Sequence, residues 1–375
     1  MARCKVIEYL EGSLSDGGAE TLVKDYVLFL DKERFEPIVL VDWIFTDSAN
    51  YKRLKYSGIQ IVSLYKRYSI FYRAVNKFFR EQYIDFKLKR ILKKLKPDVI
   101  HIHLSALHHI EKIANELKDV RLFYTCHSTP SAFFDDDERE DNAAKYLIAN
   151  NDLRLIALHD DMKEELDERF SVSNTVVVKN GINLDSYRHP AINKNEMRKS
   201  LRISDDAFVV GHVGRFSPEK NHRFIIEVFS LLLQKEPKAF LLLIGAGDER
   251  ESIESLIKEK GIEERVLILS SRTDIPELLN VMDVFVLPSL YEGLPVSLIE
   301  AQASGKRCIV SDNINSSAFV SNLVVPLPLR NKEKWCDAIL GRIDGPGYED
   351  RLQEYDISKE IKKLERVYMG EIEEL

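Results

Sequence analysis

Short runs of β-branched and aliphatic residues alternate with longer helix-forming segments, and this alternation restricts the fold more than any other feature of the chain. Strand-like runs are expected at 4–9, 37–41, 97–103, 121–125, 153–158 and 176–179, and in a second series at 208–213, 240–244, 266–269, 284–287 and 307–310. Repeated strand–helix units of this kind build parallel sheets that are covered by helices. We therefore predict an α/β fold with two Rossmann-like halves.

The two series of strands meet near residue 190, where Pro190 and several polar residues predict a linker at 189–199. A chain of 375 residues is long enough for two domains, each with its own core. We predict an N-terminal domain at 1–188 and a C-terminal domain at 189–355. Open parallel sheets bind ligands beyond the carboxyl ends of their strands, so two such domains that face each other would form a ligand-binding cleft.

Composition and cysteine usage restrict the class of protein further. Hydrophobic residues make up 45% of the chain and charged residues 31%, which indicates folded rather than disordered domains. No apolar run approaches the ~18–20 residues that a membrane-spanning helix requires. The four cysteines lie far apart without a CxxC pair, which argues against a disulfide framework or a cysteine zinc site. We therefore expect a cytoplasmic protein.

The segment 66–96 is strongly basic, although the net charge of the chain is −7. It holds eleven Lys and Arg against two acids, with aromatic residues among them. Such a segment can lie on an anionic membrane surface, where each clustered cation contributes roughly 1 kcal/mol. It could equally be a solvated helix pair whose aromatic face packs on the domain, and both interpretations stay open. If the first holds, the protein is peripheral at the inner face of the cytoplasmic membrane; we expect no nucleic-acid partner.

Two glycine-containing segments follow predicted strands and open helices. Gly17 and Gly18 permit close backbone approach, and the next helix offers amide donors and its positive dipole end to a phosphate. The segment 211–221, GHVGRFSPEKN, carries Arg215 and Lys220. A guanidinium fork and an ammonium group suit the oxygens of a diphosphate. The alternatives are an ordinary tight turn at Gly17 and Gly18 and a solvated basic loop at 211–221.

A third segment, EGLPVSLIE at 292–300, joins a strand to a helix in which Pro295 suits the first turn. Glu292 then lies on the loop and Glu300 inside the helix, so the two are not expected to form a tight carboxylate pair. We expect Glu300 to accept hydrogen bonds from ribose hydroxyls and Glu292 to lie near the transferred group. Two exposed glutamates at a helix start are the alternative.

The three segments together resemble the retaining GT-B glycosyltransferases of family four, most of all the exopolysaccharide and capsule branch. The resemblance rests on GGAE at 17–20, on GHVGRFSPEKN and on the two glutamates of EGLPVSLIE, and it runs in order from about 16 to 312. It implies the GT-B fold, with two Rossmann-like domains facing each other across a cleft and a last helix at 356–375 that packs back on the first domain.

The same resemblance implies a reaction and its substrates. A retaining transferase of this kind moves a sugar from a nucleotide-sugar, by family habit a UDP-sugar, to a saccharide or lipid-linked saccharide acceptor in bacterial surface polysaccharide biosynthesis.

Roles for single residues follow where positions match the family's motifs. Arg215 and Lys220 would hold the donor diphosphate, and Glu300 the ribose. Glu292 would contact the donor sugar, and His127 matches a histidine that also contacts it. The remaining donor-binding positions are backbone-lined turns at Gly17, Gly18, Gly214, Asn180, Gly293 and Leu294.

Other chemistries have weaker signals. The run Asp135-Asp136-Asp137 fits a metal-binding DxD pattern, and four histidines lie at 101, 103, 108 and 109. No nearby carboxylate or cysteine pattern completes a ligand set, so we expect no metal and no cofactor. Gly245-Ala246-Gly247 lacks the third glycine of a dinucleotide fingerprint, which disfavours an oxidoreductase. The main alternative is a catalytically inactive subunit that binds a nucleotide-sugar.

Overall fold

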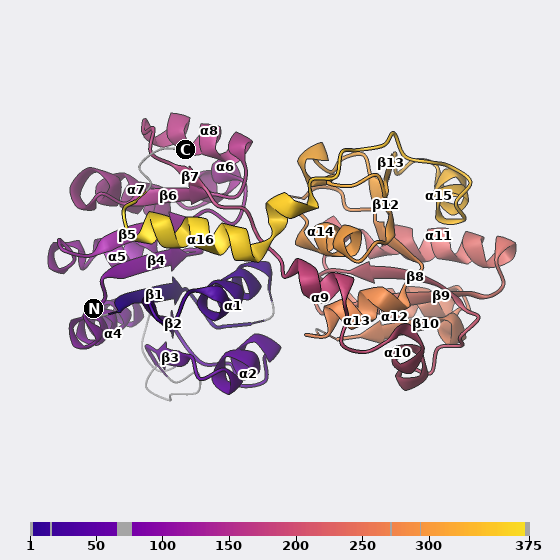
Figure 1. Cartoon of the computed structure of the whole chain (residues 1–375), viewed down its shortest axis with the longest axis horizontal. Coiled ribbons are helices and arrows are strands. Elements are labelled where there is room, and N and C mark those ends of the chain that lie inside the picture. Colours follow the sequence, from indigo (N-terminus) through magenta and orange to yellow (C-terminus); the bar gives the residue numbers. More distant parts are fainter. Residues whose placement is uncertain (1–2, 16, 66–76, 271, 293, 372–375) are drawn as a thin grey trace. The chain divides into compact units, whose positions relative to one another are not determined.

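The strands form two separate parallel sheets within residues 3–15, 17–65, 77–270, 272–292 and 294–371, which the structure, a computed structural model, describes. Each sheet belongs to its own compact unit (Figure 1): one comprises Met1–Gly181 and Ile357–Leu375, the other Ile182–Asp356. The predicted α/β fold with two Rossmann-like halves is therefore confirmed. None of the described helices is long and apolar enough to cross a bilayer.

The sheet of the first unit has the strand order β3-β2-β1-β4-β5-β6-β7. Its strands are β1 (Cys4–Leu10), β2 (Phe35–Val41), β3 (Gln60–Ser63), β4 (Val99–His103), β5 (Arg121–Thr125), β6 (Arg154–Ala157) and β7 (Val176–Val177). The central strands are buried along most of their length, as expected where helices cover both faces of a parallel sheet. Glu8 is a buried acid among these apolar residues. It lies in the middle of β1, opposite His101 of β4 in the strand register.

The helices of the first unit surround this sheet. They are α1 (Gly18–Phe29), α2 (Ala49–Tyr56), α4 (Lys77–Leu95), α5 (Leu107–Glu111), α6 (Pro130–Asp136), α7 (Glu138–Asn151), α8 (Asp160–Phe170) and α16 (Ile357–Tyr368). The last of them, α16, packs beside α1 (Figure 1). Its buried side chains recur at helical spacing, at Ile357, Ile361, Leu364 and Tyr368, and bring the end of the chain into the first core.

The second unit repeats the layered arrangement around a sheet of order β10-β9-β8-β11-β12-β13. Its strands are β8 (Phe208–Val213), β9 (Ala239–Ile244), β10 (Val266–Leu269), β11 (Val284–Leu287), β12 (Arg307–Ser311) and β13 (Val324–Leu327). Its helices are α9 (Leu184–Arg188), α10 (Lys194–Ser200), α11 (His222–Lys235), α12 (Arg250–Glu259), α13 (Ile275–Val281), α14 (Val296–Ala303) and α15 (Lys332–Ile339). As in a Rossmann-like sheet, the strand order reverses direction next to the first strand, between β8 and β11.

The predicted linker at 189–199 is wrong, because this stretch contains most of α10. Met197 is buried, and the Arg198 guanidinium donates to the Asp283 carboxylate at 2.9 Å and to the Val281 carbonyl at 3.0 Å. The compact units divide between Gly181 and Ile182 rather than at 188, because α9 packs against α13 and α14. The polar residues of this stretch suggested a linker, although they form the exposed side of α10, a helix of the second unit.

Candidate active site

The loop after β8 owes its shape to alternating inward and outward residues. Phe216 is fully buried, and its amide donates to the Ala246 carbonyl at 2.9 Å. Gly247 lies against this backbone, since a Cβ at that position would come within 2.3 Å of the Phe216 carbonyl oxygen. The glycines that follow β9 thus serve close packing, in place of the dinucleotide fingerprint considered above. Arg215, next to Phe216 in the chain, is left exposed.

Lys220 ends the same loop and forms an ion pair with Glu292. Its ammonium nitrogen lies 2.6 Å from Glu292 Oε1 and 2.8 Å from Oε2, and the buried Ser289 hydroxyl donates to Oε1 at 2.6 Å. Only 15% of the Lys220 side chain and 9% of the Glu292 side chain are exposed. The carboxylate therefore holds the ammonium group in one place, at an edge that still reaches solvent.

Two hydrogen bonds connect the loop after β8 to the loop after β11. The Leu290 amide donates to the Glu219 carbonyl at 2.8 Å, and the Asn221 side chain donates to the Pro288 carbonyl at 3.2 Å. Asn221 is in the left-handed conformation with φ of 55°, which asparagine tolerates better than most residues. The loops that carry Lys220 and Glu292 are therefore positioned as one piece.

The Arg215 side chain differs from that of Lys220 in having no hydrogen bond or ion pair with the part of the chain that the structure describes. Its charge nevertheless acts on the loop. Burial raises the pKa of Glu219, but the Ser217 hydroxyl and the positive charges of Lys220 and Arg215 lower it overall. A guanidinium that no carboxylate engages directly keeps all its donors available for an anionic ligand.

Glu300 has a partner of its own, separate from that of Glu292. It lies on α14, which begins after Pro295, and it accepts a hydrogen bond from the Tyr187 hydroxyl of α9. Leu294 is half-buried beside this helix start, whereas Gly293 lies outside the described residues. The two glutamates are thus held by different groups, consistent with the expectation that they do not form a carboxylate pair.

Two buried histidines, not anticipated from the sequence, lie beneath the loop after β8. His212 Nδ1 lies 2.9 Å from the Val286 carbonyl, and the His212 and His222 rings pack edge-to-face at 4.8 Å. Burial and the Lys220 charge hold the pKa of His222 at about 4, and the pKa of His212 is lowered well below its ordinary value by burial and by His222. Both rings are therefore uncharged, and they pack beneath the cationic loop without adding positive charge to it. Gly214 fits beside them, since a Cβ there would lie 2.8 Å from His212 Nε2.

In the first unit, Gly17 and Gly18 lie at the start of α1. The Gly17 carbonyl accepts from the Thr21 amide at 3.0 Å. The Glu20 carboxylate accepts from the Ser15 hydroxyl and folds against Gly17, where a Cβ would come within 2.3 Å of Glu20 Oε2. The negative charge of Glu20 complements the positive end of the helix dipole. A phosphate bound at the two glycines, as predicted, would therefore lie beside this carboxylate.

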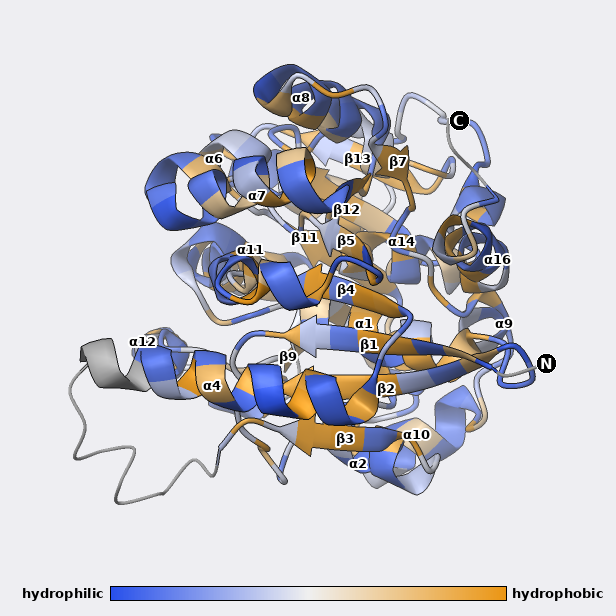
Figure 2. Cartoon of the chain, turned by 90° about the vertical axis from the view of Figure 1, so that its left-hand side faces the viewer, coloured by the Kyte–Doolittle hydropathy of each residue, from blue (hydrophilic) through white to orange (hydrophobic). Residues whose placement is uncertain are grey.

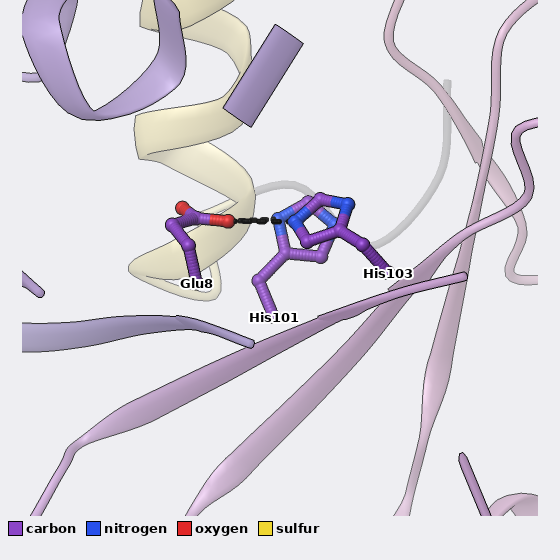
Figure 3. Close-up of side chains that lie close together, drawn as sticks. All are labelled: Glu8, His101 and His103. Carbon is purple, nitrogen blue, oxygen red and sulfur yellow. Dashed lines mark hydrogen bonds and ion pairs between the residues drawn. The ribbon is translucent and has the colours of Figure 1, made fainter. Parts of the chain in front are cut away.

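His127 follows β5 and continues a chain of buried polar side chains. His127 Nε2 lies 2.9 Å from His103 Nδ1, and His103 Nε2 lies 2.8 Å from Glu8 Oε2. His101 packs beside His103, with ring centroids 4.2 Å apart. Figure 3 shows the Glu8 carboxylate directed at the His101 and His103 rings. Both rings project from β4, and Glu8 comes from the neighbouring strand β1.

The expectation that no carboxylate accompanies these histidines is wrong, because β1 brings Glu8 alongside β4. Glu8, His101 and His103 lie close enough to share a cation. Every ring nitrogen of the two histidines already has a protein partner, since His101 contacts Tyr368 at 2.6 Å and Thr125 at 2.7 Å. The Tyr368 hydroxyl of α16 donates to Glu8 at 2.9 Å. Hydrogen bonds alone therefore account for the cluster.

The turn at Asn180 and Gly181 and the acidic run at 135–137 are explained by packing and by ion pairs within the protein. Asn180 Oδ1 is buried without a partner among the described residues. Gly181 is needed where the chain crosses α16, since a Cβ would lie 2.6 Å from Ile357 Cα. In the acidic run, Asp135 pairs with Arg169 at 2.8 Å and Asp137 with Arg139 at 2.9 Å. These aspartates have cationic side chains as partners.

Comparison with known proteins places both units in one group. A family model described as "Glycosyltransferase Family 4" matches residues 16–186, and one described as "Glycosyl transferases group 1" matches 193–355. A UDP-Gal:alpha-D-GlcNAc-diphosphoundecaprenol alpha-1,3-galactosyltransferase of Escherichia coli is 32% identical over 246 residues, 63% of each chain. An N-acetyl-alpha-D-glucosaminyl L-malate synthase of Bacillus anthracis is 26% identical, over 60% of this chain and 58% of the relative. The alignments thus span about three fifths of these relatives.

Solved structures are similar over nearly the whole length. Alr3699/HepE of Anabaena in complex with UDP superposes with a TM-score of 0.72 at 20% identity, covering 98% of this chain and 100% of that one. The same protein with UDP-glucose gives 0.73 at 20% identity, covering 98% and 99%. At this identity the similarity concerns the fold, which is that of the GT-B glycosyltransferases.

Proposed function

Because the chain belongs to the family of group 1 and family 4 glycosyltransferases, whose two models match it in order, we propose that it transfers a sugar from a UDP-sugar to a hydroxyl of a saccharide or lipid-linked saccharide acceptor. The observation that carries this proposal is the cationic loop of the second unit, with Arg215 exposed and Lys220 fixed by Glu292 at 2.6 Å. Both loops of that site follow strands at the point where a Rossmann-like sheet binds its ligands.

Each side chain of this site has a role that suits its surroundings. Arg215 and Lys220 bind the diphosphate, one with a free planar fork and the other with a compact charge held in place. Glu300 accepts from the ribose hydroxyls while Tyr187 orients it. Glu292 lies beside Lys220 and accepts from hydroxyls of the donor sugar. Gly214 and Leu294 border the two loops, and the predicted contribution of Gly293 stays a prediction.

The proposed reaction retains the configuration at the anomeric carbon. The bond from that carbon to the diphosphate oxygen breaks, a bond to the acceptor oxygen forms on the same face, and the acceptor proton passes to the departing diphosphate. Negative charge grows on the diphosphate as the bond breaks, so cations already in position lower the barrier. Lys220, which Glu292 holds in place, and Arg215 can serve this purpose, and we propose that neither a metal ion nor a cofactor is required.

The names of similar proteins support UDP as the nucleotide. The Escherichia coli relative is named for UDP-Gal and for an acceptor linked to diphosphoundecaprenol, and the Anabaena neighbour was solved with UDP and with UDP-glucose. A lipid-linked acceptor in surface polysaccharide biosynthesis, of the exopolysaccharide or capsule type, is proposed on the same basis.

The helix α4 supports contact with an anionic membrane surface. The predicted basic segment 66–96 is described only from Lys77, and its part at 66–76 lies outside the described residues. Ile84, Leu88 and Leu92 bury one stripe of α4, while Phe86 is 60% exposed. Figure 2 shows the resulting alternation of hydrophilic and hydrophobic residues along the helix. Among the α4 side chains that the structure describes, the exposed cations are Lys89, which pairs with Glu116, and Arg90, Lys93 and Lys94. We propose that this face binds anionic lipid.

Vesicle sedimentation tests the membrane proposal. Wild type should bind vesicles that contain phosphatidylglycerol, less so as salt rises, and Arg90→Gln/Lys93→Gln/Lys94→Gln should bind several-fold less, because each cation contributes roughly 1 kcal/mol. A control variant removes three exposed lysines of the second unit, Lys199, Lys258 and Lys260. Equal loss in both variants, or binding unchanged in the first, would contradict contact through α4.

Product analysis tests the transfer itself. Purified protein is incubated with UDP-sugars and with saccharide or lipid-linked saccharide acceptors, with and without EDTA, and products are examined by mass spectrometry and by NMR of the anomeric proton. We expect one UDP-sugar to add a single sugar with retained configuration, at the same rate in EDTA. Binding of UDP without any transfer would favour the inactive nucleotide-sugar-binding subunit.

A further inference from the structure

A continuous row of hydrogen-bonding side chains links a buried carboxylate to His127. It runs from Glu8 Oε2 to His103 Nε2 at 2.8 Å, and from His103 Nδ1 to His127 Nε2 at 2.9 Å. Glu8 and His103 are fully buried, and both come from central strands of the sheet. These side chains therefore have no alternative partners in solvent, and their protons must be arranged to satisfy one another.

The arrangement starts at Glu8, which is ionised. Burial alone would raise the pKa of this carboxyl, but the charges and hydrogen bonds of His101 and His103 lower it to about 2. An ionised carboxylate only accepts hydrogen bonds, so the proton between Glu8 and His103 resides on His103 Nε2. The Tyr368 hydroxyl supplies a further donor to the same carboxylate at 2.9 Å.

His103 passes this constraint to its neighbour. Burial and the adjacent His101 lower the pKa of His103 to about 4, although Glu8 acts in the opposite direction, so the ring is neutral at pH 7. A neutral imidazole with its proton on Nε2 has a bare Nδ1, which can only accept. The hydrogen bond to His127 therefore requires the proton on His127 Nε2.

We propose that Glu8 and His103 are positioning residues that fix the His127 ring in one tautomer, with the proton on Nε2 and a bare Nδ1 that accepts a hydrogen bond from a hydroxyl of the donor sugar. His127 Nδ1 has no hydrogen-bond partner among the residues that the structure describes, and His127 is only half-buried. This inference rests on the proposed function and on the contact with the donor sugar that the family resemblance predicts for His127.

The fixed tautomer has a consequence for specificity. A bare nitrogen accepts from a hydroxyl group but repels a carbonyl, an ether oxygen or a phosphate oxygen at the same position. Burial, His103 and His101 hold the pKa of His127 well below its ordinary value, so the ring stays neutral. His127 therefore recognises a free sugar hydroxyl and is not a proton donor to the departing diphosphate.

Nitrogen NMR tests the tautomer directly and needs no substrate. Long-range proton–nitrogen correlation spectra of protein labelled with nitrogen-15 in its nine histidines distinguish protonated from bare ring nitrogens. The signals lost in His127→Asn identify His127. We expect protonated Nε2 and bare Nδ1 for His103 and His127 at pH 7. A proton on His127 Nδ1, alone or in addition to Nε2, would overturn the proposal.

Steady-state kinetics test the positioning role. His103→Lys keeps a donor for Glu8 but has no atom that accepts a hydrogen bond from His127. The KM for the UDP-sugar should therefore rise about 3- to 10-fold, the effect of one hydrogen bond, while the Kd for UDP stays unchanged. Tyr26→Phe is the matched control: the Tyr26 ring packs against His101 and His103, at 5.9 Å and 6.5 Å, and its hydroxyl has no partner within the described residues.

The outcomes separate this inference from the proposed function. An unchanged KM in His103→Lys, or an equal rise in Tyr26→Phe, would overturn the positioning role. If the wild type bound no UDP-sugar at all, the proposed function would fail, whereas the NMR spectra would still decide whether Glu8 and His103 fix the tautomer of His127.

Discussion

The Lys220 ammonium nitrogen lies 2.6 Å from one carboxylate oxygen of Glu292 and 2.8 Å from the other. The cation assigned to the donor diphosphate and the carboxylate assigned to the donor sugar are thus one ion pair. Such a pair restricts the Lys220 side chain to one conformation, and it neutralises the carboxylate that would lie beside an anionic ligand. It also means that neither residue can be removed without leaving the other charge largely buried and unpaired.

Lys220→Ala is therefore expected to reduce both stability and donor binding. Loss of a charged hydrogen bond should weaken UDP binding about 10- to 100-fold, and the unpaired Glu292 should lower the free energy of unfolding by about 1–3 kcal/mol. Calorimetry and urea denaturation measure the two effects. Lys332→Ala breaks another pair of the second unit, with Glu227 at 2.7 Å, and should leave UDP affinity unchanged. Equal affinities in wild type and Lys220→Ala would contradict the role of Lys220.

Arg215→Ala should separate binding from stability. This exposed side chain makes no hydrogen bond or ion pair within the described parts of the chain, so the melting temperature should change little. UDP affinity should fall at least 10-fold, and Arg215→Lys should be intermediate, because lysine keeps the charge but lacks the planar fork. Calorimetry with UDP, alongside thermal denaturation, tests this; a large loss of stability would show that Arg215 is structural.

Glu300→Gln should affect recognition of the ribose. A carboxylate accepts hydrogen bonds from vicinal hydroxyls better than an amide does, so wild type should bind UDP more tightly than 2′-deoxy-UDP and the variant should discriminate less. Tyr187→Phe, which removes the hydroxyl that orients Glu300, should reduce discrimination to a smaller extent. Glu251→Gln, an exposed position on α12, is the control. Undiminished discrimination in Glu300→Gln would place the ribose elsewhere.

Glu11 should make stability depend on pH. Burial, followed by the charges of Asp42 and Glu140, raises the pKa of this carboxyl to about 7 from an ordinary value of 4.5. The folded state therefore favours the protonated acid, and stability falls as pH rises from about 4.5 to about 7. Glu11→Gln removes this dependence, so its stability relative to wild type should increase by roughly 2–3 kcal/mol between pH 5 and pH 8. Urea denaturation at both pH values measures the difference, and parallel pH profiles would contradict the prediction.

The sheets were largely predictable because most of their strands are buried apolar runs. The short edge strands β3 and β13, of four residues each, were missed. Strand β3 is only partly buried, and Pro326 interrupts the apolar run of β13. Helix α10 was mistaken for a linker because most of its residues are polar, and only Met197 and Arg198 are buried. The local sequence pattern therefore predicted the buried strands of the core better than the short or polar elements at the edges.

The site residues were predictable as types but not as pairs. Motif spacing indicated Lys220 and Glu292, but not that they form an ion pair across 72 residues of chain. Tyr187, 113 residues from Glu300, carries no local signal for its role. Glu8 looks like an isolated acid in an apolar strand until the register places it opposite His101. Long-range pairing of this kind depends on sheet order and packing, which one sequence does not reveal.

The most direct test of the donor site is a thermal-shift panel of UDP-, GDP-, ADP- and TDP-sugars, with and without magnesium, on wild type and Arg215→Ala. Ligands that bind only the folded state raise its melting temperature. We predict a selective shift with UDP-sugars that is independent of magnesium and absent in Arg215→Ala. No shift with any nucleotide-sugar on well-folded protein, or an equal shift in the variant, would contradict a donor site at Arg215 and Lys220.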